Sequence, residues 1–381
     1  MKITAIRTAT VRGTKDWNFV RIETDAGVSG TGEAHPGGGI TALIEERLAP
    51  LLLGANPLNV EPLYHQLLAS TTGDSTAGSL VGAIGGVEAA LWDLTGKALG
   101  IPVYQLLGGA YRDRIRLYAD VGRGRGGSLT PESWAARARE AVDEGHTALK
   151  LDIDHSADEL SNDLVARGLS LSELDRMTEQ VSAVREEIGG GIDLCIDCHA
   201  NYSVRDVLLL AERFELLALM FLEDPVPPEN IDAMAKVTAS TSIPICTGEY
   251  IYRRDGFRPL IQEQACDMLH VDVSATGGLL EAKKIADLAD LYYMPFAAHN
   301  IVSPFGMVAS AHVCAAVRNL HSMELPHHAE QVDWRWQLVT TDQPLVAGDR
   351  FRVPDGPGLG VELDEEVMAR HLAPGSGTLT G

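Results

Sequence analysis

Six ionisable residues recur at nearly equal intervals through the middle of the chain, each near the end of a short apolar run. In order, and 23 to 27 residues apart, they are Asp197, Glu223, Glu249, Asp272, His299 and Glu324. One interval is about the length of a strand and a helix together, so equal steps predict the same level on neighbouring strands. Any one acid could cap a helix by chance, but capping does not explain six groups in register.

The first three members of this series are all carboxylates, with no Cys or His among them. Three carboxylates that converge would repel one another strongly unless a cation lay between them. Oxygen ligands favour a hard cation such as Mg²⁺ over softer metals. We therefore expect a magnesium site formed by Asp197, Glu223 and Glu249.

Eight short apolar runs, alternating with amphipathic helices, would position these groups. They cover residues 115–121, 147–154, 192–199, 219–225, 243–249, 268–274, 292–299 and 320–325. This alternation predicts a parallel (β/α) barrel, in which the C-terminal ends of the strands form the catalytic face. The connection after residue 154 is unusually long.

The N-terminal part of the chain has the pattern of a small α+β domain. Strands are expected over residues 2–11 and 18–27, and turn glycines over residues 27–34. Helices are expected over residues 40–54 and 85–99. In the last helix Asp93 and Lys97 are spaced for an ion pair, and Gly-Ile-Pro follows as a stop signal. The chain ends in a Gly/Ser/Thr-rich tail that is expected to fray.

The bulk composition limits the classes of function. With 381 residues, of which 45% are hydrophobic, the chain can bury a large core in two or three domains. A formal net charge of −22 argues against nucleic acid as a partner. The first residues lack a signal-peptide core, no stretch is long enough to span a membrane, and five cysteines are not a disulfide framework. We expect a cytoplasmic protein without membrane or nucleic-acid partners.

The run CIDCH, Cys195 to His199, matches a c-type haem attachment motif. If the run is a strand, however, Cys195, Asp197 and His199 share one face and Cys198 lies on the other. Two cysteines on opposite faces cannot bond one haem edge, and no second Cys pair exists at zinc spacing. The informative part is Asp-x-His on one face. A haem protein stays a separate class of function, which the absorbance of the purified protein would test.

The run GRGRGG, residues 122–127, satisfies the dinucleotide-binding pattern after an apolar run. The next helix, however, is predicted to begin only at Thr130 and Pro131, whereas in a true fingerprint the third Gly lies in the first helical turn. We interpret the run as a loop in which Arg123 or Arg125 could meet an anionic substrate.

With these residues in view, the chain resembles the enolase superfamily, and within it the mandelate-racemase-like group. The resemblance covers nearly the whole chain. It rests on the six residues of the series and on the runs ALWDLTGKALG, residues 90–100, and PGLGVELDE, residues 357–365.

This resemblance implies a domain organisation. Residues 113–325 would form a modified (β/α)7β barrel, an α/β fold. An N-terminal α+β domain over residues 1–112 would cap it, and residues 326–381 would return to that capping domain. Loops of the capping domain, around residues 15–18 and 57–72, would then close over the substrate.

The resemblance also implies a chemistry, the removal of a proton next to a carboxylate. The resulting enediolate carries two negative charges, which a Mg²⁺ held by the three acids would neutralise. His299 would be the base, oriented and made more basic by Asp272. Glu324 would hydrogen-bond the substrate carboxylate, and Lys150 would lie near the metal or that carboxylate.

One position departs from many relatives, which carry Lys-x-Lys on the second barrel strand. Here Lys150 is present, but Asp152 stands in place of the second Lys, and racemisation needs bases on both faces. His199 is the candidate replacement, and Asp-x-His on the third strand is similar to acid-sugar dehydratases of the galactonate and mannonate type. There the corresponding His is a general acid that protonates the departing 3-hydroxyl.

We therefore expect a Mg²⁺-dependent lyase, a sugar-acid dehydratase that yields a 2-keto-3-deoxy sugar acid. A cycloisomerase or epimerase using the same enediolate stays open, as does a non-catalytic sugar-acid-binding homologue. Relatives of this kind usually form homo-oligomers. Candidate substrate contacts are Lys15, Trp17, Arg123, Arg125, Asp152, His327 and Trp334. His270, one layer deeper than Asp272, is expected to be a packed core residue.

Overall fold

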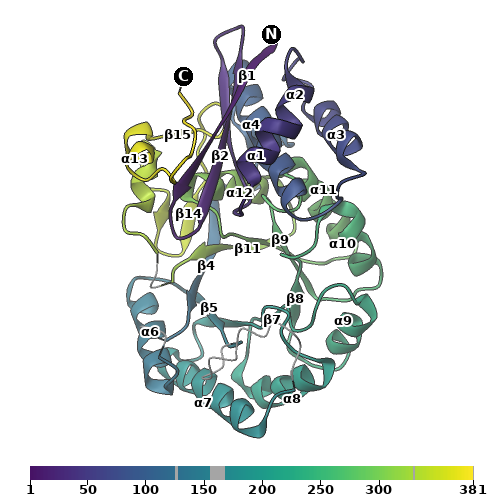
Figure 1. Ribbon diagram of the computed structural model, residues 1–381. Helices are drawn as coiled ribbons and strands as arrows, with labels where there is room; N and C mark the ends of the chain where they lie inside the picture. Colours follow the sequence, from purple (N-terminus) through teal and green to yellow (C-terminus); the bar gives the residue numbers. More distant parts are fainter. Residues whose placement is uncertain (125–127, 155–167, 329–330, 381) are drawn as a thin grey trace.

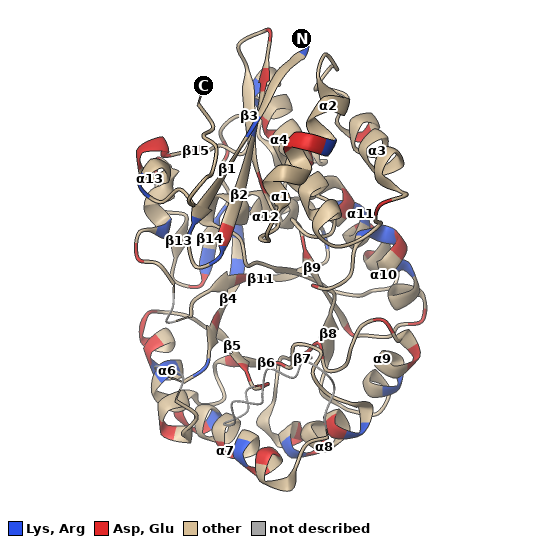
Figure 2. Ribbon diagram, in the orientation of Figure 1, with Lys and Arg blue, Asp and Glu red and all other residues tan. Residues whose placement is uncertain are grey.

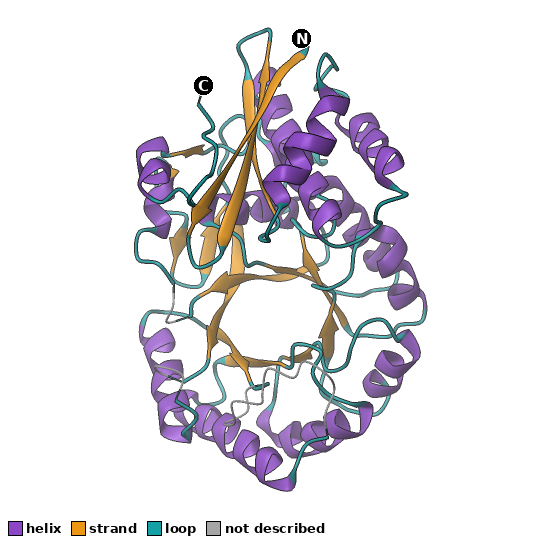
Figure 3. Cartoon of the chain, viewed as in Figure 1, coloured by secondary structure: helices purple, strands orange, loops and turns teal. Residues whose placement is uncertain are grey.

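The computed structural model describes residues 1–124, 128–154, 168–328 and 331–380. A ring of strands surrounded by helices forms the larger part, and a second group of strands and helices lies against one side of it (Figures 1 and 3). Both chain ends lie in this second group. Among the described residues no helix is both long and apolar enough to cross a membrane.

The ring is a closed barrel of eight parallel strands, in agreement with the predicted runs. They are β4 (Arg114–Gly122), β5 (Ala148–Asp152), β6 (Asp193–Asp197), β7 (Phe221–Glu223), β8 (Ile245–Thr247), β9 (Met268–Asp272), β10 (Phe296–His299) and β11 (Leu320–Pro326). Each pairs with the next in sequence, and β11 closes the ring by pairing with β4.

Helices cover the outside of the barrel. They are α6 (Pro131–Asp143), α7 (Leu171–Ile188), α8 (Val204–Phe214), α9 (Ile231–Thr238), α10 (Arg253–Gln262), α11 (Leu279–Asp290) and α12 (Pro304–Ala316), with a 3₁₀ turn, η4 (Glu215–Leu217), after α8. Thr130 caps α6, as predicted, by accepting from the backbone N–H of Ser133. Most of the long connection after residue 154 lies outside the described residues.

Strand alternation divides the barrel core into two layers. Seven side chains fill the centre of the barrel: Tyr118, Ala148, Cys195, Phe221, Cys246, Met268 and Ala297. The opposite faces of the strands pack against the helices, and Cys198 belongs to that outer cluster. The two cysteines of the haem-like motif therefore lie in different layers, as the strand period predicts.

The capping group contains a three-stranded antiparallel sheet and several helices. Its elements are β1 (Ile3–Arg12), β2 (Asp16–Thr24), β3 (Ser29–Ala34), α1 (Ile40–Ala42), the π-helical η1 (Leu43–Leu48), α2 (Ala49–Leu52), α3 (Val60–Thr71), α4 (Ser79–Leu99) and α5 (Val103–Leu106). The predicted ion pair forms on α4, where Lys97 Nζ lies 2.9 Å from Asp93 Oδ2.

Two local predictions for this region are wrong. The expected turn glycines of residues 27–34 lie largely in strand β3, where Gly30 and Gly32 face α4 so closely that a Cβ would clash with the helix backbone. The expected loop over 57–72 is mostly helix α3, and its buried face includes Val60, Leu63 and Leu67. That i, i+3, i+7 spacing is a helical signal, which the sequence contains.

The C-terminal segment extends from the barrel back to the capping sheet. It comprises η5 (Arg335–Leu338), β12 (Val339–Thr340), β13 (Val346–Ala347), β14 (Arg350–Arg352), β15 (Glu362–Leu363) and α13 (Glu365–Arg370). β14 pairs with β4 of the barrel, and the backbone N–H of Arg12 donates to the His371 carbonyl. The tail does not fray as expected, because Leu379 is buried and Ser376 Oγ accepts from the Thr10 backbone.

Two buried carboxylates of the capping group hold barrel helices by their N-termini. Glu33 on β3 accepts hydrogen bonds from Ser303 and Gly306 at the start of α12. Glu88 on α4 accepts from the backbone N–H groups of Leu279 and Leu280 at the start of α11. The free N–H groups of a helix N-terminus attract negative charge. These contacts fix the capping group on the barrel.

Candidate active site

A cavity of about 640 Å³ lies over the C-terminal ends of the barrel strands. Residues of both the barrel and the capping group line it, among them His35, Lys150, His199, Glu249, His299 and His328. Acidic residues occur along the strand ring (Figure 2). Strand register explains this gathering, because Asp197 pairs directly with Glu223 and His299 with Asp272. The predicted common level is confirmed for these two pairs, whereas Glu249 lies two residues beyond the end of β8, in which Cys246 is the residue that pairs with Glu223.

Lys150 lines this cavity and lies at the centre of an acidic cluster. Its Nζ is 2.9 Å from Asp197 Oδ2, 2.8 Å from Glu324 Oε1 and 3.3 Å from Glu223 Oε2. Burial disfavours the ammonium, but the surrounding carboxylates outweigh it and raise the pKa of Lys150 well above its usual value. The side chain therefore supplies a fixed positive charge.

Glu223 is fully buried behind the cavity wall and depends on this charge. Neither of its carboxylate oxygens accepts a hydrogen bond from the described residues. Burial, and next the nearby Asp197 carboxylate, raise the pKa of Glu223 well above its usual value. Its other close neighbour is His270 Nδ1, 2.5 Å from Oε1. Burial lowers the pKa of His270 to about 4, so this ring is neutral and packed, as predicted.

His299 is held at both ring nitrogens. Asp272 Oδ2 lies 2.8 Å from Nδ1 on one side, and Glu249 Oε2 lies 2.8 Å from Nε2 on the other. Asp272 is itself fixed, because Ser274 Oγ and the Ala275 N–H donate to its Oδ1. Burial disfavours the imidazolium, but Glu249, Glu324 and Asp272 together raise the pKa of His299. The pair has the geometry of an oriented base.

His199 lies two residues beyond the end of β6, with a left-handed backbone at φ 44°. Its Nε2 is 3.6 Å from Asp197 Oδ2, and its Nδ1 is 3.2 Å from Asp154 Oδ1. Its backbone N–H donates to Asp197 Oδ1, which fixes the turn. Burial opposes protonation, yet Asp197 and Asp154 raise the pKa of His199. A protonated His199 beside the cavity can act as a general acid.

The carboxylates also fit a hard divalent cation. Asp197 ends β6, Glu223 ends β7 and Glu249 lies two residues beyond β8, and all three offer oxygen atoms alone. The two oxygens of Glu223 are buried and have polar nitrogens nearby, but none of these is in hydrogen-bond geometry. Both oxygens could therefore still bind a cation. Glu223 and Glu249 also belong, with His270, to a cluster whose ligand atoms lie within 4.8 Å of one another.

Two family models match this chain, one in its N-terminal part and one in the remainder. The mandelate racemase/muconate lactonizing enzyme N-terminal domain matches residues 3–108, and the enolase C-terminal domain-like model matches residues 133–367. The chain belongs to the enolase superfamily. Within the superfamily it is a mandelate racemase/muconate lactonizing enzyme-like protein, as the resemblance indicated.

Relatives within the superfamily span the same length. A D-xylonate dehydratase of Haloferax volcanii is 42% identical over 98% of this chain and 90% of its own. A D-galactonate dehydratase of Xanthomonas euvesicatoria pv. vesicatoria is 33% identical over 97% and 94%. The crystal structure of a mandelate racemase/muconate lactonizing enzyme-like protein from Rubrobacter xylanophilus superposes with a TM-score of 0.93, at 39% identity over 99% of both chains.

The predicted substrate contacts of this enolase-superfamily chain fall into three groups. Lys15, Arg123 and Asp152 line the cavity. Trp17 lines a smaller neighbouring pocket together with Lys15, while Trp334 packs edge-on against Trp17 and stacks on His371. His327 does not line the cavity, because its Nε2 lies 2.7 Å from Glu144 behind α6. Arg125 lies outside the described residues.

Several cavity residues were not predicted. Asp120 closes the first barrel strand and would have been found by applying the strand-end rule there as well. His328 follows His327 directly, and the sequence offers no signal that the second of the two faces the cavity. His35 reaches Asp272 Oδ2 at 3.6 Å from the capping group, which only the three-dimensional arrangement reveals.

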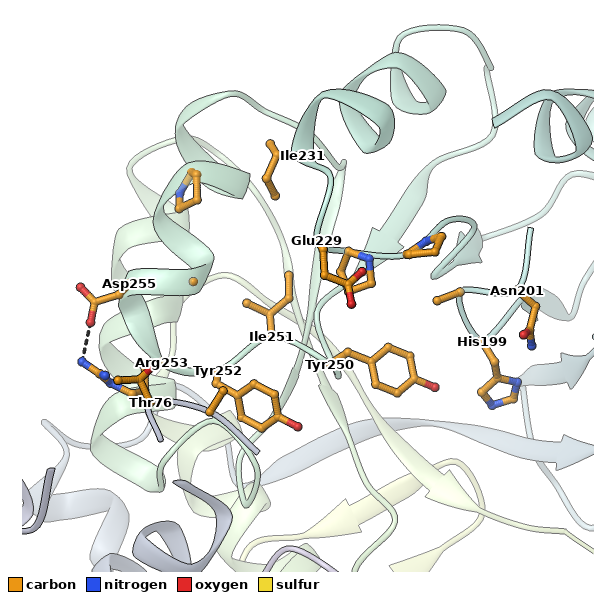
Figure 4. A pocket seen from close by; sticks show the side chains of 16 residues that line it. Thr76, His199, Asn201, Glu229, Ile231, Tyr250, Ile251, Tyr252, Arg253 and Asp255 are labelled. Carbon is orange, nitrogen blue, oxygen red and sulfur yellow. Dashed lines mark hydrogen bonds and ion pairs between the residues drawn. The ribbon is translucent and has the colours of Figure 1, made fainter. Parts of the chain in front are cut away.

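A larger outer pocket of about 1020 Å³ adjoins the cavity on the His199 side. The two share His199, Asn201, Tyr250 and Tyr252. Figure 4 shows Tyr250 between Tyr252 and His199 in that view, with Arg253 paired to Asp255 at the far wall. The catalytic cavity therefore opens toward a wider space next to His199.

Proposed function

We propose that this protein is a Mg²⁺-dependent acid-sugar dehydratase. The observation that carries the proposal is the placement of two histidines, His299 and His199, around one cavity that Lys150, Glu249 and Glu324 also line. One histidine is oriented by Asp272 as a base, and the other lies between two carboxylates that keep it protonated. Elimination of water needs such a base and such an acid.

Asp197, Glu223 and Glu249 would hold one Mg²⁺ per subunit. When bound, the ion supplies positive charge next to the substrate carboxylate. Lys150, already paired with Asp197 and Glu324, adds a second fixed charge at the same place. Glu324 Oε2 accepts a hydrogen bond from the Asn300 N–H, and its Oε1 lies next to Lys150. Glu324 is thus within reach of a substrate carboxylate bound beside Lys150.

His299 removes the proton from C2 of the sugar acid through Nε2, which would be free to do so when Glu249 holds the cation instead of this nitrogen, while Asp272 holds Nδ1 and fixes the tautomer. His199 then gives its proton to the 3-hydroxyl, so that the C3–O bond breaks and water leaves. The product is an enol with a C2=C3 double bond. Its conversion to the keto form, by gain of a proton at C3 and loss of the hydroxyl proton, gives the 2-keto-3-deoxy acid.

The substrate is proposed from the relatives. D-xylonate, the substrate in the name of the 42% identical relative, is the first candidate, and D-galactonate is the second. Both are mono-acids that carry hydroxyls at C2 and C3. The outer pocket beside Tyr250 leaves room for the carbons beyond C3.

The test is a screen of aldonic acids and six-carbon di-acids with purified protein and Mg²⁺ in D₂O. Proton NMR and a colorimetric 2-keto acid assay report the outcome. We expect a 2-keto-3-deoxy product that EDTA abolishes. Deuterium at C2 without elimination would instead support an epimerase or cycloisomerase, and the absence of both signals would support a sugar-acid-binding protein.

A further inference from the structure

Apart from the C2 hydroxyl proton, which is lost to solvent, the reaction proposed above contains three proton transfers to or from the substrate, and two of them have a histidine. His299 takes the C2 proton and His199 protonates the leaving hydroxyl. The last transfer delivers a proton to C3 of the enol. The donor in this third transfer is inferred here, and its assignment rests on the proposed function.

A third histidine lines the same cavity. His328 follows β11, and the cavity wall beside it is formed by Asp120, Lys150 and Asp152 of β4 and β5. The other two histidines lie on different strands of the barrel, because His299 ends β10 and His199 follows β6. His328 thus faces the substrate space from a different side.

His328 is oriented in the same manner as the proposed base. Its Nε2 lies 2.8 Å from Asp120 Oδ2, as His299 Nδ1 lies 2.8 Å from Asp272 Oδ2. Asp120 is fixed in turn, because its Oδ1 accepts from the Gly122 N–H at 3.0 Å and its carbonyl accepts from the His327 N–H. The carboxylate therefore holds the ring in one position.

The backbone leaves room for this ring. Gly122 has a φ of 63°, and a Cβ there would lie 2.7 Å from His328 Nδ1. A side chain at residue 122 would push the imidazole away from Asp120. Glycine at this position permits both the left-handed backbone and the close approach of the ring.

The neighbouring carboxyl, Asp152, has one oxygen without a hydrogen-bond partner among the described residues, whereas His328 Nε2 faces Asp120. Asp152 occupies the position of the second Lys in Lys-x-Lys relatives, and the oxygen concerned is its buried Oδ1. Burial, and next Asp120, raise the pKa of Asp152 well above its usual value. For His328, burial opposes protonation but Asp120 raises the pKa to about 9.

We propose that His328, held by Asp120, is the proton donor to C3 in the last step. The electron pair of the C2=C3 bond takes the imidazolium proton to form the new C3–H bond. The C2 hydroxyl loses its proton to solvent as the C2=O bond forms. His328 regains a proton from water, which its partly exposed side chain can reach. No further reactant is consumed.

The experiment measures where deuterium enters C3 when the substrate found in the screen is turned over in D₂O. The wild-type protein should deuterate one of the two C3 positions, because a positioned donor acts from one side. In His328→Asn we expect deuterium at both positions in nearly equal amounts, because the enol then takes its proton from solvent. Substrate loss should fall less than about ten-fold, since elimination precedes this step.

His327→Asn is the matched control, because it changes the adjacent histidine outside the cavity. It should retain one-sided deuteration and the wild-type rate. If His328→Asn does not fold, Asp120→Asn removes the partner that orients the ring and should also give both positions. One-sided deuteration in a folded His328→Asn or Asp120→Asn protein would overturn the proposal, as would loss of all elimination in His328→Asn. Absence of any keto acid with wild-type protein would overturn the proposed function as well.

Discussion

Lys150 places a buried positive charge among four carboxylates, those of Asp120, Asp197, Glu223 and Glu324. Without it these groups would face one another in a dry environment. The lysine therefore does locally what the proposed Mg²⁺ does from the cavity side. The charge of Lys150 favours the ionised form of these buried acids.

Lys150→Met should for this reason destabilise the metal-free protein by about 3–5 kcal/mol, because it leaves buried carboxylates without their partner. Added Mg²⁺ should recover part of this loss. Denaturant unfolding in EDTA and in Mg²⁺ measures both effects. Lys236→Met, at an exposed position, is the control and should change stability little. Equal stability of Lys150→Met and wild type in EDTA would contradict the cluster's role.

Some residues of the site can be predicted from the sequence and others cannot. The strand-end carboxylates and the Asp272 and His299 pair follow from strand spacing, which places Asp197 level with Glu223 and Asp272 level with His299. His199 follows from the Asp-x-His pattern and from the resemblance to acid-sugar dehydratases. His328 was missed and its neighbour His327 chosen, because both follow the last strand and only the turn after β11 decides which ring faces the cavity. A loop conformation of this kind is not indicated by any periodic pattern in the sequence.

At the scale of elements, β3 and α4 meet with almost no space between them. Gly30 and Gly32 allow this contact, since a Cβ on Gly30 would clash with the Ala90 carbonyl oxygen. The close approach brings Glu33 and Glu88 to the starts of α12 and α11. Helix and strand packing in the capping group therefore sets the position of the helices around the barrel.

We expect Gly30→Ala to destabilise the protein by about 1–3 kcal/mol, because the methyl group must force the strand and helix apart. Thermal or denaturant unfolding measures the change. Gly73→Ala is the matched control, because a Cβ there would have no neighbour within 4 Å. A Gly30→Ala protein as stable as wild type would show that β3 can shift without cost.

Element types were more predictable than their contacts. The eight barrel strands follow from alternating apolar runs, and the start of α6 follows from Thr130 and Pro131. Residues 27–34 were assigned to a turn because glycines are usually turn residues, whereas here they serve packing against α4. The reason lies in a tertiary contact with residues 86–94, which no local pattern contains.

For the whole molecule, His312 connects three parts of the chain. It lies on α12, its Nδ1 accepts from the Tyr104 N–H of α5, and its Nε2 donates to the Leu359 carbonyl of the C-terminal segment. Burial lowers the pKa of His312 from 6.5 to about 4, so the folded protein holds the neutral ring. Between pH 4 and pH 6.5 the ring of His312 is therefore protonated in the unfolded chain and neutral in the folded protein.

This difference makes stability depend on pH. The contribution of His312 is intact above pH 6.5 and is lost as the pH falls toward 4, by up to about 3 kcal/mol. Glu33 and Glu88 act in the opposite direction, because burial raises each pKa from 4.5 to about 7 and favours the protonated acid at low pH. The comparison with His312→Gln isolates the histidine, since both proteins share the two acids.

The gap in unfolding free energy between wild type and His312→Gln should therefore be largest above pH 6.5 and shrink toward pH 4. Denaturant unfolding across this range measures it. A gap that does not change with pH would mean that His312 titrates alike in the folded and unfolded chains.

One experiment distinguishes the role of His199 as acid from the role of His299 as base in the proposed elimination. His199→Asn and His299→Asn are incubated with D-xylonate, or the substrate found in the screen, and Mg²⁺ in D₂O. We expect His199→Asn to exchange the C2 hydrogen for deuterium while keto acid formation falls at least about 10²-fold, and His299→Asn to lose both. Keto acid formation at the wild-type rate in His199→Asn, or C2 exchange in His299→Asn, would contradict the assignment of acid and base.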